Sequence, residues 1–428
     1  MRAIDGRRRE HGLPGCRQPI HDANDNAKGS ITMGWKGSLA ELPLWVAGRL
    51  GPQPIGSRNE APRSILVLRP NDLGDLLTTT PIFEALRRRF PNAHLVAGIG
   101  RWGRAIVENN PFVDEILELD APWHNKIMPD QSMGAALRFI RDSAQVRAAR
   151  ERGGFDVGID VLGSQFGLLL MLRLGVRYRI GVRGYRGGWS GCHDHIRFSP
   201  MVHVSRAALA QAELLGARDL PEARPQLYLT DFERVQAAHV WRTGAVAGRR
   251  PVRLLVGCAA GLPDKSWAPE ALGEALGRVS RALADAGGSD IVIVGGAAEK
   301  SCAQTVIEHS GAAPSIRSLA GQTPLRATFA LAEQADVVVT NPSMLLHAAA
   351  AFRRPTVAVL GGPFGDARGH DGVWGYSAPY GSVGPENAVS YGHMSGWPSV
   401  ERVAQAILDK IAAHAVSCRA DRLSIGLN

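Results

Sequence analysis

The chain has 428 residues, 45% of them hydrophobic, and a formal net charge of +9. This hydrophobic content is typical of a globular protein, and the length predicts two domains rather than one. The positive charge suits nucleic acid, a membrane surface or an anionic small molecule as partner. Because no nucleic-acid-binding motif accompanies the charge, we expect no nucleic-acid partner.

The cysteines and the apolar runs bear on the cellular compartment. The five cysteines are widely spaced and form no C-x-x-C pair, which favours free thiols in a reducing cytoplasm. No apolar run reaches the roughly 18 residues that a membrane-spanning helix needs, and the N-terminus lacks the order of a signal peptide. We therefore expect a cytoplasmic protein.

Residues 1–62 are polar, interrupted by glycine and proline, and poor in periodic apolar residues, which predicts a disordered N-terminal extension. Residues 39–50 are the exception and predict a short amphipathic helix interrupted by Pro43. Such a helix packs on the protein's own surface or, alternatively, attaches loosely to a membrane surface. The second alternative would allow peripheral contact of the protein with the inner membrane.

Residues 64–89 predict the unit around which the chain is organised. Residues 65–68 (ILVL) are typical of a buried strand in a parallel sheet. A polar turn with Gly74 follows, and then apolar residues at helical spacing. This order opens a doubly wound α/β domain, whose ligands bind at the carboxyl ends of the strands, so Asp72 and Asp75 should face a cleft. Asp75 is either an acid favoured by the helix dipole or a general base.

The first half of the chain continues this alternation. Arg101 and Arg104 follow the second predicted strand, and the loop 120–132, which holds Lys126, is long for a connection. These three cations are candidate ligands of an anionic acceptor. A first domain over residues 63–225 is predicted, and a linker follows it. Its further strands are predicted at 94–98, 113–117, 155–161, 176–181 and 193–198, with a helix at 204–215.

The second half opens with another buried-strand pattern, residues 252–257. The following loop is rich in small residues, Gly261 among them, and carries Lys265. Backbone N–H groups and an ammonium group placed between a strand and a helix suit a phosphate site. The alternation continues and predicts a second doubly wound domain over residues 250–395. Its further strands are predicted at 290–296, 335–340 and 355–360, with a helix at 325–334, a loop at 364–391 and a C-terminal amphipathic helix at 398–413.

Four short motifs stand in order along residues 64–413. They read R-x-x-x-L-G-D-x-x-x-T-x-P, K-x-W-x-x-E, G-G-x-x-E and N-x-S-x-x-x-H-x-x-A-A. Together they resemble the motifs of glycosyltransferase family 9, the heptosyltransferase family. The residues that carry this resemblance are Arg69, Leu73, Gly74, Asp75, Thr79, Pro81, Lys265, Trp267, Glu270, Gly295, Gly296, Glu299, Asn341, Ser343, His347, Ala350 and Ala351.

The resemblance implies the GT-B fold, in which two Rossmann-like domains face one cleft and the last helix packs back across both. It implies an inverting, metal-independent glycosyltransferase that needs no cofactor. The first domain would bind a sugar, lipid-linked or small-molecule acceptor, and the second a nucleotide sugar, most simply ADP-heptose. Asp75 would be the general base. The implied donor-binding residues are Lys265, Asn341, Ser343, His347, Gly261 and Gly295, and the implied acceptor-binding residues are Asp72, Arg101, Arg104 and Lys126.

The last motif departs from the family pattern N-D-S-G-x-x-H at two positions. Pro342 stands in place of the acid, which removes an acceptor for sugar hydroxyls, and Met344 stands in place of the glycine, which restricts the approach of the backbone to a phosphate. Two alternatives therefore stay open: a glycosyltransferase with another donor or with a natural-product or protein acceptor, and a catalytically silent binding protein. An NAD(P) enzyme is disfavoured, because neither domain has G-x-G-x-x-G after its first strand.

Overall fold

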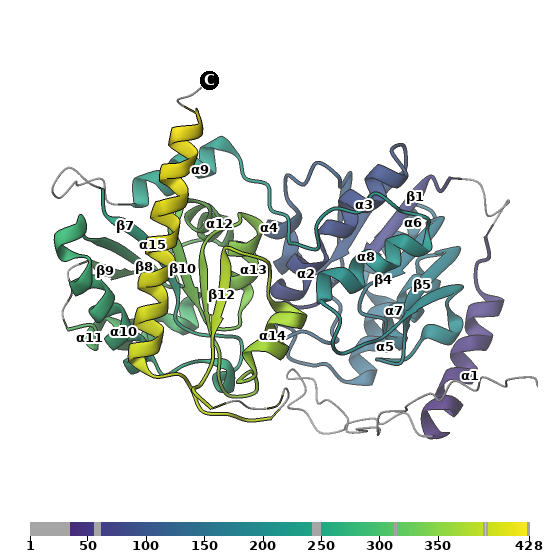
Figure 1. Ribbon diagram of the computed structural model, residues 1–428. Helices are drawn as coiled ribbons and strands as arrows, with labels where there is room; N and C mark the ends of the chain where they lie inside the picture. Colours follow the sequence, from purple (N-terminus) through teal and green to yellow (C-terminus); the bar gives the residue numbers. More distant parts are fainter. Residues whose placement is uncertain are drawn as a thin grey trace, which may run out of the picture.

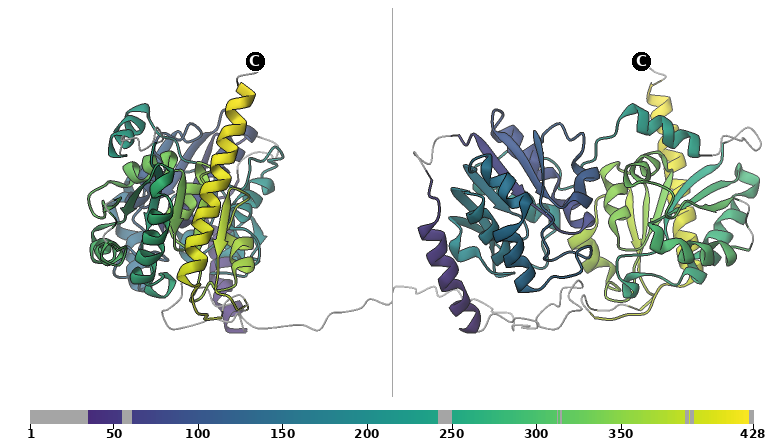
Figure 2. Two further views of the ribbon diagram at one scale, coloured as in Figure 1. Left: turned by 60° about the vertical axis from the view of Figure 1, so that its left-hand side comes forward. Right: turned by 180° about the vertical axis from the view of Figure 1, so that it is seen from behind.

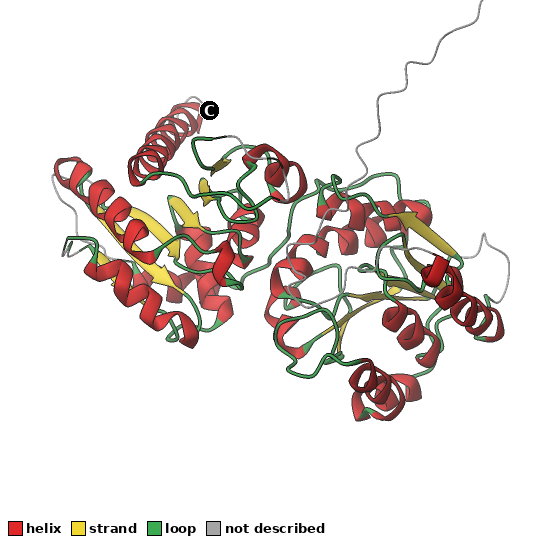
Figure 3. Cartoon of the chain, turned by 90° about the horizontal axis from the view of Figure 1, so that it is seen from below, coloured by secondary structure: helices red, strands yellow, loops and turns green. Residues whose placement is uncertain are grey.

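The computed structural model describes residues 35–54, 61–241, 250–311, 313, 315–387, 390 and 393–425. Figure 1 shows two α/β units side by side. Helices lie on both faces of each sheet (Figure 3). Within the described ranges, no helix is both long and apolar enough to cross a membrane. The first 34 residues of the predicted extension lie outside these ranges.

The first sheet has six parallel strands in the order β3-β2-β1-β4-β5-β6. The strand order reverses between β1 and β4, where Leu66 lies between Val96 of β2 and Gly158 of β4. This is the strand order of a Rossmann-like domain, as predicted. The strands are β1 (Ser64–Leu68), β2 (His94–Ile99), β3 (Glu115–Glu118), β4 (Val157–Asp160), β5 (Tyr178–Arg183) and β6 (Asp194–Arg197).

The helices of this unit follow the strands in alternation. The predicted helix after β1 is divided, because Thr80 ends α2 and Pro81 begins α3. The helices are α2 (Leu73–Thr79), α3 (Pro81–Arg89), α4 (Arg104–Val107), α5 (Met133–Asp142), α6 (Ala144–Glu151), α7 (Gln165–Arg173) and α8 (Val204–Leu214), with short 3-10 turns η1 (Arg101–Gly103) and η2 (Trp189–Gly191).

The second sheet repeats the same topology in the order β12-β11-β10-β7-β8-β9, again with all strands parallel. Its strands are β7 (Val252–Gly257), β8 (Ser289–Val294), β9 (Ile316–Ser318), β10 (Val337–Thr340), β11 (Thr356–Val359) and β12 (Tyr380–Val383). The helices of this half are α9 (Asp231–Val240), α10 (Pro269–Ala282), α11 (Lys300–Glu308), α12 (Leu325–Gln334), α13 (Met344–Ala351), α14 (Ala367–Trp374) and α15 (Val400–Ile425), with short turns η3 (Pro263–Lys265), η4 (Ala284–Ala286) and η5 (Ala297–Glu299).

The prediction of a loop over residues 364–391 was wrong, because this segment contains α14 and the edge strand β12. The strand YGSV is short and has no apolar run, so periodicity does not reveal it. Tertiary contacts hold it instead: β12 pairs with β11, and the Lys410 ammonium donates a hydrogen bond of 3.1 Å to the Tyr380 carbonyl.

The C-terminal helix also differs from the expectation. It runs from Val400 to Ile425, well beyond residue 413, and it packs against α10 and strands β10, β11 and β12 of the second unit rather than across both units. Figures 1 and 2 show it on the second unit. Its apolar residues Val403, Ala404 and Ile407 join the core of that unit, which explains why its packing is confined there.

The helix predicted at residues 39–50 is confirmed, but it begins earlier than expected, because α1 runs from Trp35 to Leu50; it packs on the first unit, as one of the two alternatives expected. The fully buried Arg179 of β5 holds the end of this helix. Its guanidinium donates hydrogen bonds of 2.6 Å to the Gly48 carbonyl and 2.7 Å to the Pro52 carbonyl. Sequence composition does not reveal this contact, because the partner lies more than a hundred residues away.

Two arginines join the two units through buried or half-buried contacts. Arg224, between α8 and α9, donates a hydrogen bond to the Ala350 carbonyl at the end of α13. Arg326, at the start of α12, donates one of 3.0 Å to the Ala105 carbonyl of α4 and pairs with Glu233 of α9. The two sheets are therefore linked at the side where α2 packs against α13.

We expect Arg179→Ala to release α1. The change leaves the carbonyls of Gly48 and Pro52 without their donor and opens a cavity, which should lower the free energy of unfolding by about 3 kcal/mol. Hydrogen exchange should show residues 41–54 exchanging much faster than in the wild type. The control is Arg177→Ala, which removes a half-exposed ion pair with Asp156 and should cost less than about 1 kcal/mol. Unchanged exchange in α1 would contradict this role of Arg179.

Candidate functional site

The site is built from the loops at the carboxyl ends of β1 and β10, the places where each sheet changes strand order. Asp75 lies in the first turn of α2, directly after β1. Arg69 directly follows β1, and its Nη2 lies 3.4 Å from Asp75 Oδ1. Thr78 and Thr79 donate side-chain hydrogen bonds to the Asp75 carbonyl. The Asp75 carboxylate is therefore oriented by an arginine, while the two hydroxyls bind the backbone carbonyl of the same residue.

Asp72 and Lys126, which were both predicted to bind the acceptor, contact each other. The Lys126 N–H donates a 2.8 Å hydrogen bond to Asp72 Oδ1, and its ammonium lies 3.9 Å from Oδ2. Burial raises the pKa of Asp72; its hydrogen bond from Lys126 opposes this, and the nearby charge of Asp75 adds to it. Asp72 thus anchors the long loop that carries Lys126.

That loop also reaches the second unit. A side-chain carbon on Gly261 would lie 2.7 Å from the Lys126 ammonium, so a larger residue at this position would displace the end of the lysine side chain. Lys126 is therefore placed between Asp72 of the first unit and the loop after β7. The two loops that were predicted to bind acceptor and donor lie side by side.

Lys265, the predicted phosphate ligand, ends the short turn η3 and is largely buried. Its ammonium lies 4.9 Å from the centroid of the Phe364 ring, in a cation–π contact. Ser266 next to it accepts a 2.8 Å hydrogen bond from the Ala260 N–H, which closes the loop on itself. The lysine is held by its surroundings, as a residue that binds an anion should be.

Asn341 has a positioning role in the structure. Its Oδ1 accepts a 2.9 Å hydrogen bond from the Trp267 N–H, and its Nδ2 donates one of 3.1 Å to the Cys258 carbonyl. The buried amide thus ties the loop after β10 to the loop after β7. Both ends of its side chain bind backbone, so contact with a donor stays a prediction.

Ser343 precedes α13 and is the N-cap residue of that helix. Its hydroxyl lies 3.0 Å from the Thr340 hydroxyl and forms no capping bond within the helix. The N–H groups of the first turn of α13 consequently have no side-chain acceptor from the cap. A helix N-terminus of this kind attracts anions through its unpaired N–H groups and its dipole.

His347 lies one turn into α13 and faces α2 of the first unit. A side-chain carbon on Gly74 would lie 3.3 Å from His347 Cδ2, so the helices meet through a glycine. The His347 Nδ1 lies 2.7 Å from the Tyr376 hydroxyl. Burial lowers the pKa of His347 to about 3, with smaller contributions from the charges of His203 and His370. His347 is therefore neutral near pH 7 and supports the site without adding positive charge.

Three of the predicted residues lie apart from this group. Arg101 forms an ion pair with Asp120, and Arg104 donates a 2.6 Å hydrogen bond to Glu118. Both arginines are at the outer strands of the first sheet, where acids of the same unit already pair with them. Gly295 follows β8, and a side-chain carbon there would lie 2.9 Å from the Glu299 side chain.

Sequence reasoning assigned no role to Tyr376, Phe364 or Arg69. Arg69 is the first residue of the first motif, six positions before Asp75. This fixed spacing could have indicated that the arginine pairs with the candidate base. Tyr376 and Phe364 lie in the segment expected to be a loop, so nothing in the sequence indicated that they pack against His347 and Lys265. Among the described residues, no three His, Cys, Asp or Glu side chains converge as metal ligands would; metal independence stays a prediction.

The sequence of this chain matches a known protein family. The model of glycosyltransferase family 9 (heptosyltransferase) matches residues 146–363, half of the chain. The chain is 25% identical over 313 residues to lipopolysaccharide heptosyltransferase 2 of Escherichia coli K12, an alignment that covers 69% of this chain and 82% of that protein.

Solved structures have the same fold. The family 9 glycosyl transferase of Veillonella parvula aligns with a TM-score of 0.67 at 19% identity, over 83% of this chain and all of that one. The ADP-heptose lipopolysaccharide heptosyltransferase II of E. coli aligns with a TM-score of 0.62 at 20% identity, over 83% and 99% of the two chains. These alignments confirm the predicted GT-B arrangement of two Rossmann-like domains.

Acid should destabilise the protein through His347. The unfolded chain binds a proton there near pH 6.5, whereas the folded chain binds it only near pH 3. Between these values the unfolded state holds the extra proton, so the free energy of unfolding is greatest above the unfolded pKa and falls as the pH falls. We expect a loss of about 2 kcal/mol between about pH 6.5 and pH 5 in urea denaturation.

The matched variants separate this effect from general acid sensitivity. His347→Asn removes the titrating ring and should lose most of this pH dependence. His309→Asn removes an exposed histidine of the second unit and should keep it. Equal pH dependence in His347→Asn and the wild type would show that His347 is not the buried neutral group described above.

Proposed function

Because this chain belongs to glycosyltransferase family 9 and is a glycosyltransferase, we propose that it transfers a heptose from ADP-heptose to a hydroxyl of a lipopolysaccharide core sugar. The observation that carries the proposal is the contact between Gly74 and His347. It places Asp75, next to Gly74, beside the first turn of α13. A candidate base of one unit thus lies at the candidate diphosphate site of the other.

The proposed reaction is a single displacement with inversion. Asp75 accepts the proton of the acceptor hydroxyl while the hydroxyl oxygen forms a bond to the anomeric carbon. The bond from that carbon to the diphosphate oxygen breaks in the same step, and ADP leaves with the electron pair. Arg69, 3.4 Å from Asp75, holds the carboxylate in place and would remain its partner after protonation.

The departing diphosphate would be stabilised by groups of the second unit. Lys265 supplies a positive charge, and the first turn of α13 supplies N–H groups and a dipole. His347 is neutral, so we assign it the role of holding α13 against α2. This set of groups would let the transfer proceed without a metal ion.

The acceptor would enter from the first unit, past the loop that Asp72 anchors through Lys126. Lys126 lies against Gly261 of the donor loop, so a single cation can contact an anionic acceptor and the donor together. Arg101 and Arg104 already pair with acids, so contact with an acceptor would require these ion pairs to open.

A different donor is the second candidate function, and Met344 favours it. The Cα of Met344 would lie 3.9 Å from a side-chain carbon on Gly74, so this residue stands beside the Asp75 turn. Its side chain replaces the family glycine at that point. Met344→Gly should then improve the use of ADP-heptose relative to other nucleotide sugars, whereas a wild type selective for ADP-heptose would remove this candidate.

Asp75→Asn should abolish transfer. The amide cannot accept the proton, so kcat should fall at least about a thousandfold while the affinity for ADP changes little. The measurement is release of nucleoside diphosphate from ADP-, GDP- and UDP-sugars, with and without a lipopolysaccharide-core acceptor. Asp142→Asn is the matched control, because Asp142 also pairs with an arginine but is exposed on α5. If Asp75→Asn retained transfer activity, Asp75 would not be the general base.

Lys265→Met should weaken donor binding. The substitution keeps most of the side-chain volume against Phe364 but removes the charge, so ADP should bind about 10- to 100-fold less tightly. Calorimetric titration with ADP measures this directly. Lys300→Met, at the exposed start of α11, is the control and should bind as the wild type does. Equal ADP affinity in Lys265→Met would place the diphosphate elsewhere.

A further inference from the structure

Helix α1 is apolar on the side that faces away from the protein. Four large apolar residues recur there at helical spacing and share one face. They are Leu42, Trp45, Val46 and Leu50, which are 59%, 45%, 40% and 83% exposed. We call this face the α1 stripe.

The opposite side of α1 carries the polar contacts. Glu41 is buried, and its carboxylate accepts hydrogen bonds of 2.8 Å from the Gly188 N–H and 3.1 Å from the Ser190 N–H. Gly48 is buried against η2. A surface helix normally buries its apolar side and exposes its charges. α1 instead buries the charged Glu41 and exposes four large apolar side chains, so the α1 stripe is available to a partner that is itself apolar.

The position of α1 leaves this stripe accessible. Figures 1 and 2 show α1 at the end of the first unit that is farthest from the second. None of the described helices packs over it, since its contacts are with η2 and α7. A contiguous exposed apolar patch of this kind marks an interaction site.

The charge next to the stripe is positive. Arg49 lies on the same side, with its guanidinium 5.7 Å from the Trp45 ring centroid. The residue that follows α1, Gly51, packs against Leu172 near the end of α7. Leu172 is followed by Arg173, which lines a groove between α5 and α7.

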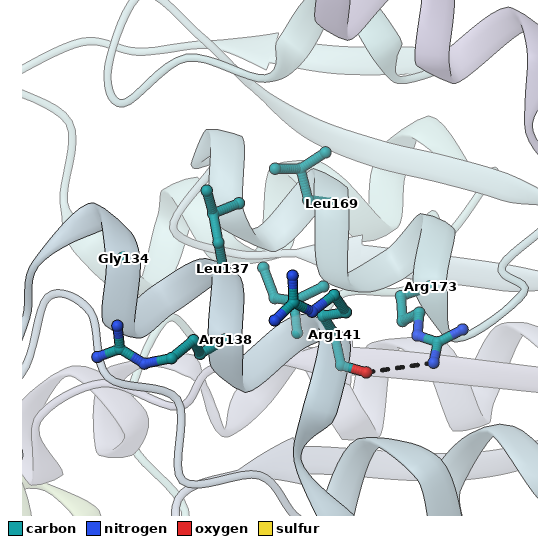
Figure 4. Close-up of a pocket in the computed structure, with 7 residues that line it drawn as sticks. Gly134, Leu137, Arg138, Arg141, Leu169 and Arg173 are labelled. Atoms are coloured by element: carbon teal, nitrogen blue, oxygen red, sulfur yellow. Dashed lines mark hydrogen bonds between the residues drawn. The ribbon is translucent and has the colours of Figure 1, made fainter.

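This groove has a volume of about 780 Å³. Both leucines and arginines line it, as the side chains labelled in Figure 4 show. Arg173 donates a hydrogen bond to the Arg141 carbonyl, and its buried Nε has no partner among the described residues. Two aspartates neutralise part of the charge, because Arg138 pairs with Asp130 and Arg141 with Asp142. The lining residues are Gly134, Leu137, Arg138, Ile140, Arg141, Leu169 and Arg173.

We propose that the α1 stripe and the adjoining groove dock on the surface of an anionic lipid bilayer. The apolar side chains enter the boundary between headgroups and acyl chains, where tryptophan is favoured. Arg49 and Arg173 contact lipid phosphates, which attract basic residues at a membrane surface. An anionic bilayer fits both features, because it offers an apolar phase directly beneath a layer of negative charge. The inference does not depend on which sugar the enzyme transfers.

Flotation of the full chain with lipid vesicles tests this. The wild type should float with vesicles of phosphatidylethanolamine and phosphatidylglycerol, float far less with phosphatidylcholine, and be released by salt. The triple variant Leu42→Ser, Val46→Ser, Leu50→Ser should bind the anionic vesicles at least roughly tenfold more weakly. These three residues are exposed, so the thermal unfolding midpoint should stay close to that of the wild type.

The matched control carries Phe232→Ser and Val235→Ser, which remove apolar residues that are 72% and 53% exposed on α9 of the second unit. This variant should float as the wild type does. The proposal fails if the wild type stays with the unbound fraction, or if the triple variant and the wild type float equally. It also fails if the triple variant changes only the oligomeric state, because the stripe would then be an interface between copies of the chain.

Discussion

The contact between α2 and α13 is the constraint on which the rest of the site depends. Two domains can bind two substrates separately, but transfer requires the base of one to reach the sugar held by the other. Here the helices meet at Gly74, where a larger residue would press on His347. His347 in turn is buried, neutral and paired with Tyr376. The packing therefore fixes where Asp75 stands relative to the first turn of α13.

The other groups follow from this contact. Arg69, directly after β1, orients Asp75, and Asn341 ties the loop that leads into α13 to the loop that carries Lys265. Lys126 links Asp72 to Gly261 across the domains. Each of these residues contacts backbone or a second charged group, so the site is held in shape by the fold. α1 packs on the first domain at the end far from the second (Figure 1), and its exposed stripe is the surface that we propose for a lipid partner.

Much of this was predictable from the sequence, for reasons that are local. Buried parallel strands read as apolar runs, so β1, β2 and β7 lie where residues 65–68, 94–98 and 252–257 predicted them. The turns at Asp75 and Lys265 follow such strands. Both turns therefore lie at the carboxyl ends of parallel strands, where a ligand site of this fold is expected. The missed features depend on distant partners: β12 depends on β11 and Lys410, the anchoring of α1 depends on Arg179, and the neutral state of His347 depends on its burial. No local pattern encodes these contacts.

A crystal structure of the chain with a non-transferable analogue of ADP-heptose tests the central claim most directly. The account predicts the diphosphate at the first turn of α13 and Lys265, with the anomeric carbon facing Asp75 and room for one hydroxyl, about 3 Å from the carboxylate, between them. A diphosphate bound away from Lys265, or a sugar turned away from Asp75, would contradict it. Either result would show that the α2–α13 contact does not position Asp75 for the transfer reaction.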